Sequence, residues 1–141
     1  MKKHQAPTAG KLTVLRQVCN YIPPYLVPKI AHQTGVDEKA RTFSPWSHTV
    51  SLGYAQLTHA LSLNDVCDGL QLNSGPLSAI RAATAPTRNN LSHANKVRDA
   101  AMAETLFWED LKYLGDLSPG FVSGRAGKKF LRKFKRKIHA I

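Results

Sequence analysis

Residues 44–70 read SPWSHTVSLGYAQLTHALSLNDVCDGL, and this stretch decides the fold class. Ser44 can cap the free amides at a helix start, and Pro45 suits the first helical position. Apolar residues then recur at helical spacing along one face, which predicts a helix over 46–61. They are Trp46, Val50, Tyr54, Leu57 and Leu61.

Ser62 is placed to cap a second helix over 62–71, with Asp65 three residues further on. The apolar residues of this helix follow an i, i+3, i+4, i+7 pattern. They are Leu63, Val66, Cys67 and Leu70. Two consecutive amphipathic helices in the middle of the chain favour a helical domain.

The same spacing extends outward in both directions. On the N-terminal side it predicts a helix over 11–22, with Leu12, Leu15, Val18, Cys19 and Ile22 on its apolar face, and a short helix that Gly35 ends. On the C-terminal side it predicts a short helix over 76–83 and a long helix over 88–114 that Gly115 ends. No stretch alternates as a strand does, so the prediction is an all-α, compact multi-helix domain.

The charge is concentrated at the two ends of the chain. The 141 residues carry a formal charge of +11. Residues 1–36 contribute +5, residues 37–116 contribute −2, and residues 117–141 contribute +8 without a single acid. Such blocks of like charge are typical of partner-binding segments, and phosphate backbones are their commonest partners. We therefore predict a flexible arm at 1–10, a helical DNA-binding domain at 11–116, and a glycine-containing linker with a basic segment at 117–141.

The basic segment is the first candidate DNA contact. Its eight bases would follow a phosphate backbone without reading sequence. They are Arg125, Lys128, Lys129, Arg132, Lys133, Lys135, Arg136 and Lys137. A solvated tail and a membrane-surface helix, with Phe130 and Phe134 on one side, are the alternatives.

Base readout needs a helix that exposes polar side chains early in its length. Two helix pairs compete for this helix-turn-helix-like role: 62–71 with 76–83, and the start of the 88–114 helix. The second is preferred because its polar side chains are types that bond bases and phosphates. They are Arg88, Asn89, Asn90, Ser92, His93 and Lys96. The plain alternative is a polar helix start with no role in binding.

Nothing in the sequence indicates catalysis or metal binding. Asp65 and Asp68 fit a cap and a surface acid, and His48 and His59 are too far apart for a local metal clip. Cys19 and Cys67 lie on apolar stripes and fit core positions. Glu104 is the exception, because it falls inside the apolar stripe of the 88–114 helix. We expect it to be at least half buried with a polar partner from another helix.

The order of several motifs resembles a known family. Phe43-Ser44-Pro45-Trp46-Ser47-His48, then Tyr54-Ala55-Gln56-Leu57-Thr58 and Ser62-Leu63-Asn64-Asp65-Val66, resemble the N-terminal region of bacterial insertion-sequence transposases of family four. The run from Arg88 to Ala100, RNNLSHANKVRDA, is similar to one subgroup of that family. The resemblance covers roughly residues 11–137.

The resemblance implies a double-stranded DNA partner, the transposon ends, and a DDE catalytic domain that holds divalent metal such as Mg²⁺ on two Asp and one Glu. That domain opens with a basic run and Ile-His before its first Asp. Here Ile138-His139-Ala140-Ile141 ends the sequence, with no acid beyond Asp116. We therefore expect a transposase N-terminal domain that is truncated before its catalytic carboxylates, inactive alone and without a cofactor. A truncated regulator that pairs with itself or with the full-length transposase, and a general nucleic-acid binder, are the alternatives.

No apolar run approaches the roughly 20 residues of a membrane span. The first residues also lack the apolar stretch of a signal peptide. A soluble, cytoplasmic protein associated with the nucleoid and not with membranes is the expectation.

Overall fold

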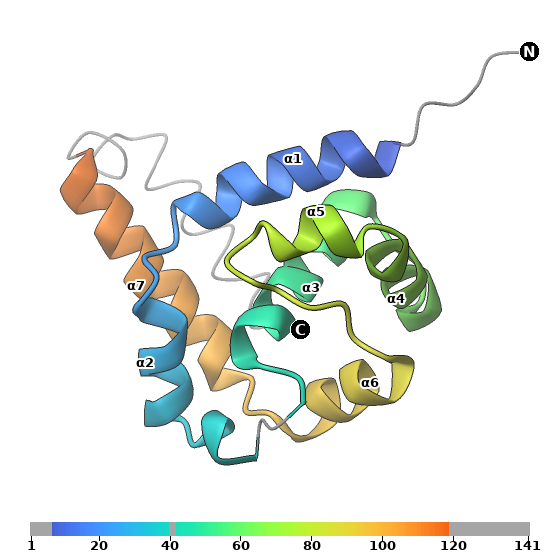
Figure 1. Ribbon diagram of the computed structural model, residues 1–141. Coiled ribbons are helices and arrows are strands. Elements are labelled where there is room, and N and C mark those ends of the chain that lie inside the picture. The colour runs from blue at the N-terminus through green and yellow to red at the C-terminus, as the bar shows by residue number, and fades with distance from the viewer. Residues whose placement is uncertain (1–6, 40–41, 119–141) are drawn as a thin grey trace, which may run out of the picture. The chain divides into compact units, whose positions relative to one another are not determined.

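A computed structural model describes residues 7–39 and 42–118, and within these ranges every regular element is a helix (Figure 1). The all-α prediction is confirmed. None of these helices is long and apolar enough to span a lipid bilayer. The chain divides into two compact units, Met1–Asp99 and Ala100–Ile141.

The first unit is organised around one central helix, α3 (Pro45–Thr58), which packs against α1, α2 and α4. Helix α4 also contacts α5 and α6. The bounds of the other elements in this unit are α1 (Pro7–Asn20), α2 (Leu26–Gln33), the 3-10 helix η1 (Val36–Lys39), α4 (Leu63–Leu72), α5 (Ser74–Ser78) and α6 (Arg88–Val97). The second unit contains α7 (Ala101–Leu117).

The core of the first unit forms where these helices meet. Its buried side chains include Leu12 and Leu15 of α1, Val50 and Tyr54 of α3, Val66 and Leu70 of α4, and Leu91 and Ala94 of α6. Helices α3 and α4 approach closely at Gly69, where an added Cβ would lie 2.1 Å from the Tyr54 hydroxyl oxygen. Any larger residue at position 69 would therefore force the Tyr54 ring or the helices to shift.

The predicted helix caps are confirmed. The Ser44 hydroxyl accepts a hydrogen bond from the Ser47 amide at 3.0 Å, and Pro45 is the first residue of α3. The Ser62 hydroxyl accepts from the Asp65 amide at 3.1 Å and starts α4. Both bonds satisfy amides that have no partner within their own helix.

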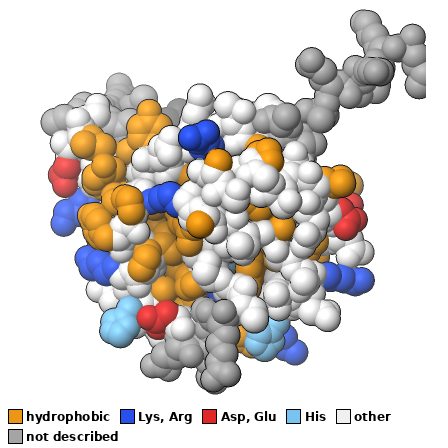
Figure 2. Space-filling model, viewed as in Figure 1, with side chains coloured by type: hydrophobic (Ala, Val, Ile, Leu, Met, Phe, Trp, Pro, Cys, Tyr) orange, Lys and Arg blue, Asp and Glu red, His pale blue; other side chains and the backbone are white. Residues whose placement is uncertain are grey.

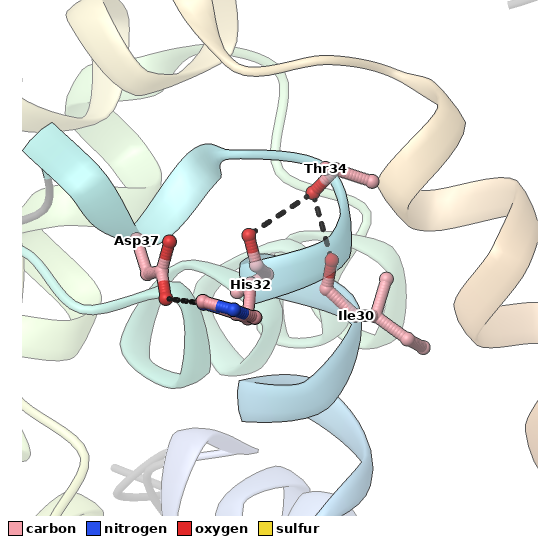
Figure 3. Close-up of polar contacts among 5 residues, drawn as sticks. Ile30, His32, Thr34 and Asp37 are labelled. Atoms are coloured by element: carbon pink, nitrogen blue, oxygen red, sulfur yellow. Dashed lines mark hydrogen bonds and ion pairs between the residues drawn. The ribbon is translucent and has the colours of Figure 1, made fainter.

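Helix α2 ends as its sequence predicts (Figure 3). Gly35 follows it with a φ of +72°, a conformation that costs glycine little. The Thr34 hydroxyl donates to the Ile30 carbonyl at 2.9 Å, and His32 Nδ1 lies 3.2 Å from Asp37 Oδ2. These contacts turn the chain from α2 into η1, a short element that the polar sequence of 36–43 did not predict.

Two predicted apolar faces are wrong at one residue each. Helix α1 begins at Pro7, ahead of the predicted start at residue 11, and Val18 is 51% exposed while Leu12, Leu15 and Cys19 are buried. Helix α3 ends at Thr58 because His59 takes a left-handed conformation. Leu61 therefore lies beyond the helix, 96% exposed.

The predicted helix over 76–83 forms only in part, and α5 begins earlier, at Ser74. Helix α5 ends at Ser78, and Arg81 and Ala82 both have positive φ, which breaks the helical path. Tertiary contacts hold this conformation. The Arg81 guanidinium donates to the Cys19 carbonyl at 3.0 Å and lies 3.9 Å from the Trp46 ring centroid.

The long helix predicted over 88–114 is two helices. Helix α6 ends at Val97, and Arg98 has extended backbone with ψ of 139°. Its guanidinium donates to the backbone carbonyl oxygens of Phe43 and Ser44, far away in sequence. These tertiary bonds outweigh the local helical preference. Gly115 does not end α7, which continues to Leu117.

Glu104 lies on α7 and is partly buried, as expected. The expected polar partner is not found: within residues 7–39 and 42–118, no hydrogen bond or ion pair joins its carboxylate to another side chain. The break at Arg98 also removes Val97 from the helix that carries Glu104, so the apolar stripe on which the expectation rested does not run through both.

Candidate nucleic-acid interface

The start of α6 is fixed by a capping residue and by a hydrogen bond from α4. The Thr87 hydroxyl accepts from the Asn90 amide at 3.1 Å, so the helix begins at Arg88. The Gln71 side-chain amide of α4 donates to the Pro86 carbonyl at 3.1 Å, and Pro86 is fully buried. The residues that precede α6 are thus fixed to the body of the unit.

Helix α6 turns one face to the core and the opposite face to solvent. Leu91 and Ala94 are buried. The residues Asn89, Ser92, His93 and Lys96, which we name the outer stripe, are all exposed. Their i, i+3, i+4, i+7 spacing places them on one side of the helix.

The other two predicted residues of α6 flank the outer stripe. Arg88 is exposed and lies at the helix start. Asn90 is partly buried, and its amide is used in the cap. The structure therefore places Asn89, rather than Asn90, on the exposed surface.

The outer stripe has the chemistry of a base-reading surface. Asparagine can bond both the N6 and N7 positions of adenine, lysine can bond guanine or phosphate, and serine can bond either type of base. An α-helix fits the major groove of duplex DNA. The ten residues of α6 include no acid, so nothing on the helix repels phosphate. In the view of Figure 2, Lys, Arg and His side chains lie at the lower right, where Figure 1 places α6, and the acidic side chains of that view lie elsewhere.

The end of α6 is anchored to the start of α3. His48 Nε2 lies 2.7 Å from Asn95 Oδ1, and the His48 ring stacks at a tilt 5.6 Å from the Phe43 ring. Burial lowers the pKa of His48, and the Arg98 charge lowers it further, while the hydrogen bond to Asn95 acts in the opposite direction. The imidazole is therefore held in its neutral form at neutral pH.

Sequence reasoning missed this anchor. Residue type and spacing alone assign no contact to His48, Asn95 or Arg98. One feature of the sequence could have indicated the contact: these residues lie inside the two motifs, 43–48 and 88–100, that carry the family resemblance. The structure brings those two motifs together.

The competing recognition helix fails on geometry. Helix α5 has five residues, and Arg81, which lies within the predicted 76–83 helix, is beyond the end of α5 and contacts Cys19 and Trp46. Asn73 alone joins α4 to α5, in place of the three- or four-residue turn of a helix-turn-helix. The candidate interface is therefore α6 alone, presented by α3 and α4.

The basic segment lies outside the described residues, and so do all eight of its predicted phosphate contacts, Arg125 to Lys137.

Within the part of the chain that the structure describes, no group of three His, Cys, Asp or Glu side chains could hold a metal ion. Cys19 and Cys67 are buried free thiols, as expected. Burial raises the pKa of Cys19 to about 11 and raises that of Cys67 as well.

Comparison with known protein families places most of the first unit in a family. A family model described as a domain of unknown function, DUF4372, matches residues 10–80, about half of the 141-residue chain. The matched range reaches from α1 through α5 and stops short of α6. No curated protein and no solved structure matches the chain.

Proposed function

We propose that this chain, which belongs to the DUF4372 family, is a DNA-binding module that recognises transposon ends as the N-terminal domain of an insertion-sequence transposase. The observation that carries the proposal is the outer stripe of α6. Four polar side chains point away from the core on an acid-free helix whose start is capped and whose end is anchored. A surface of this kind suits the edges of base pairs.

Two further features support the proposal. The eight bases and no acids of residues 117–141 supply the phosphate attraction that a recognition helix needs. The two motifs that resemble transposases, 43–48 and 88–100, contact each other through His48 and Asn95, which supports interpreting them as one functional unit.

A second candidate is nucleic-acid binding without sequence readout. The charge of +8 on residues 117–141 favours it, because phosphate contacts alone give non-specific affinity. The two candidates differ in whether α6 reads bases.

The test is selection by the purified 141-residue chain from a pool of duplex DNA with a randomised central segment. An enriched sequence, bound more tightly than its shuffled version, supports recognition. Binding to the pool without enrichment supports the general binder. Preference for RNA over duplex DNA contradicts the first candidate, and preference for anionic vesicles over nucleic acid contradicts both.

Variants sharpen the assignment to α6. Asn89→Ala should weaken preference for the enriched sequence by about 1–3 kcal/mol if it loses a base contact. Lys29→Ala removes an exposed charge from α2 and is the control for general electrostatics. If Asn89→Ala and Lys29→Ala discriminate between sequences equally well, α6 is not the reading helix.

A further inference from the structure

The C-terminal end of α6 is joined to the N-terminal end of α3 by polar groups of both. The His48 Nε2–H donates to Asn95 Oδ1 at 2.7 Å. The Arg98 guanidinium donates to the carbonyl oxygens of Phe43 and Ser44 and lies 5.4 Å from the Phe43 ring centroid. His48 is only 9% exposed and Phe43 4% exposed, whereas Asn95 lies at the surface, so the contacts join a buried ring to the outer side of α6.

The opposite end of α6 is held by a different helix. Gln71 of α4 bonds the chain just before the helix, and Leu91 is buried in the core that includes Val66 and Leu70 of α4. A helix of ten residues is about 15 Å long. Supports from α4 at one end and α3 at the other therefore fix its direction as well as its position.

We propose that His48, Asn95 and Arg98 act as an orientation clamp: positioning residues that set the angle at which α6 presents its outer stripe to DNA. This inference rests on the proposed function. It assigns the control of sequence specificity in DNA binding to these three residues. His48, Asn95 and Arg98 form hydrogen bonds to other groups of the protein, while Asn89, Ser92, His93 and Lys96 face outward.

The physical reason is that base contacts and phosphate contacts tolerate different errors in side-chain position. Hydrogen bonds to base edges need side chains held within about 0.5 Å and 10–20° of the productive geometry. Phosphate contacts made by lysine are point-charge interactions and carry no sequence information. Loss of the clamp should therefore reduce discrimination between sequences and spare general affinity.

The experiment uses the 141-residue chain, the sequence enriched from the random duplex pool, and the shuffled form of that sequence. We expect Asn95→Ala and His48→Leu to reduce the affinity ratio of the two DNAs about tenfold, the scale of one lost base contact. Affinity for the shuffled DNA should change by less than about twofold, because the phosphate contacts remain.

Conservative and control variants separate positioning from simple loss of structure. His48→Gln places an amide nitrogen where His48 has Nε2 and should restore most of the ratio. Val97→Ala changes an exposed residue of α6 outside the clamp and should leave the ratio unchanged. Helical circular dichroism and the retained affinity for shuffled DNA confirm that each variant is folded.

The possible failures are distinguishable. If the wild-type chain enriches no sequence, the proposed recognition function fails and the clamp fails with it. If the wild type enriches a sequence and folded Asn95→Ala discriminates as well as wild type, the clamp alone is overturned. If affinity for both DNAs falls together while the fold is kept, Asn95 contributes to general affinity and is not a positioning residue.

Discussion

Nε2 of His48 lies 2.7 Å from Oδ1 of Asn95, and the two residues are 47 positions apart in the sequence. This bond joins the first turn of α3 to the last turn of α6. It also places a titratable ring in a poorly solvated position beside a permanent positive charge, because Arg98 lies in the same cluster. The packing of α6 is therefore coupled to the protonation of one histidine.

The first prediction concerns pH. The pKa of His48 in the folded state is lowered below its ordinary value of 6.5, so the unfolded chain takes up the proton first as the pH falls. The contribution of neutral His48 to stability is present above about pH 6.5 and declines below it. Urea unfolding across pH should show wild type losing stability relative to His48→Gln below that value. His93→Gln, on the exposed face of α6, is the control, and a pH-independent difference would contradict the prediction.

A second prediction concerns Asp110 of α7. Burial raises the pKa of its carboxyl from 3.8 to about 6, and Oδ1 has no hydrogen-bond partner among the described residues. The folded state binds this proton more tightly, so stability falls as the pH rises through this window. Asp110→Asn should stabilise the protein above about pH 6 and lose that advantage below about pH 4. Equal unfolding midpoints for wild type and Asp110→Asn at neutral pH would contradict this prediction.

The cap of α3 gives a third prediction. Ser44→Ala removes the acceptor for the Ser47 amide and should lower the free energy of unfolding by about 1 kcal/mol. Ser92→Ala, at an exposed position inside α6, should change it by less than about 0.5 kcal/mol. Urea titrations of the two variants make the comparison directly, and similar losses would show that the cap contributes nothing special.

The crossing of α3 and α4 gives a fourth prediction. Gly69→Ala places a Cβ 2.1 Å from the Tyr54 hydroxyl oxygen and 2.9 Å from Cζ, so the helices must separate or the ring must move. We expect a loss of about 1–3 kcal/mol, typical of overpacked cores. Gly75→Ala is the matched control, since nothing lies within 4 Å of its added Cβ. Thermal unfolding that ranks the two variants equally would refute the close approach.

The cysteines give a fifth prediction. Cys19 is 4% exposed and its pKa is raised to about 11, so little reactive thiolate is present at neutral pH. Cys67 is also buried, with a raised pKa. Iodoacetamide should label neither thiol in the folded protein and both in urea, as mass spectrometry would report. Rapid labelling of the native chain would show that the core around α1 opens easily.

What the sequence predicted well was local. Ser44, Ser62 and Gly35 act within a few residues of their own position, and all three cap or end helices as expected. The apolar face predicted for α4 is also correct, because Val66, Cys67 and Leu70 are all buried in the core.

The helix ends that the sequence did not predict are determined by contacts between residues far apart in the chain. Arg98 stops a helix because two carbonyl oxygens, more than 50 residues earlier, accept its hydrogen bonds. Arg81 stops another by reaching Cys19 and Trp46. For the candidate interface, residue types predicted α6 as the polar helix, but which of its asparagines faces outward follows only from the phase that Leu91 and Ala94 set.

The extended residue at Arg98 has a mechanical consequence. An unbroken helix over 88–114 would be a stiff rod of about 40 Å that transmits torque from one end to the other. The break divides that rod, because Arg98 leaves the helical path and bonds the Phe43 and Ser44 carbonyls instead. The C-terminal end of α6 is thus fixed within its own unit, by bonds to the segment that precedes α3.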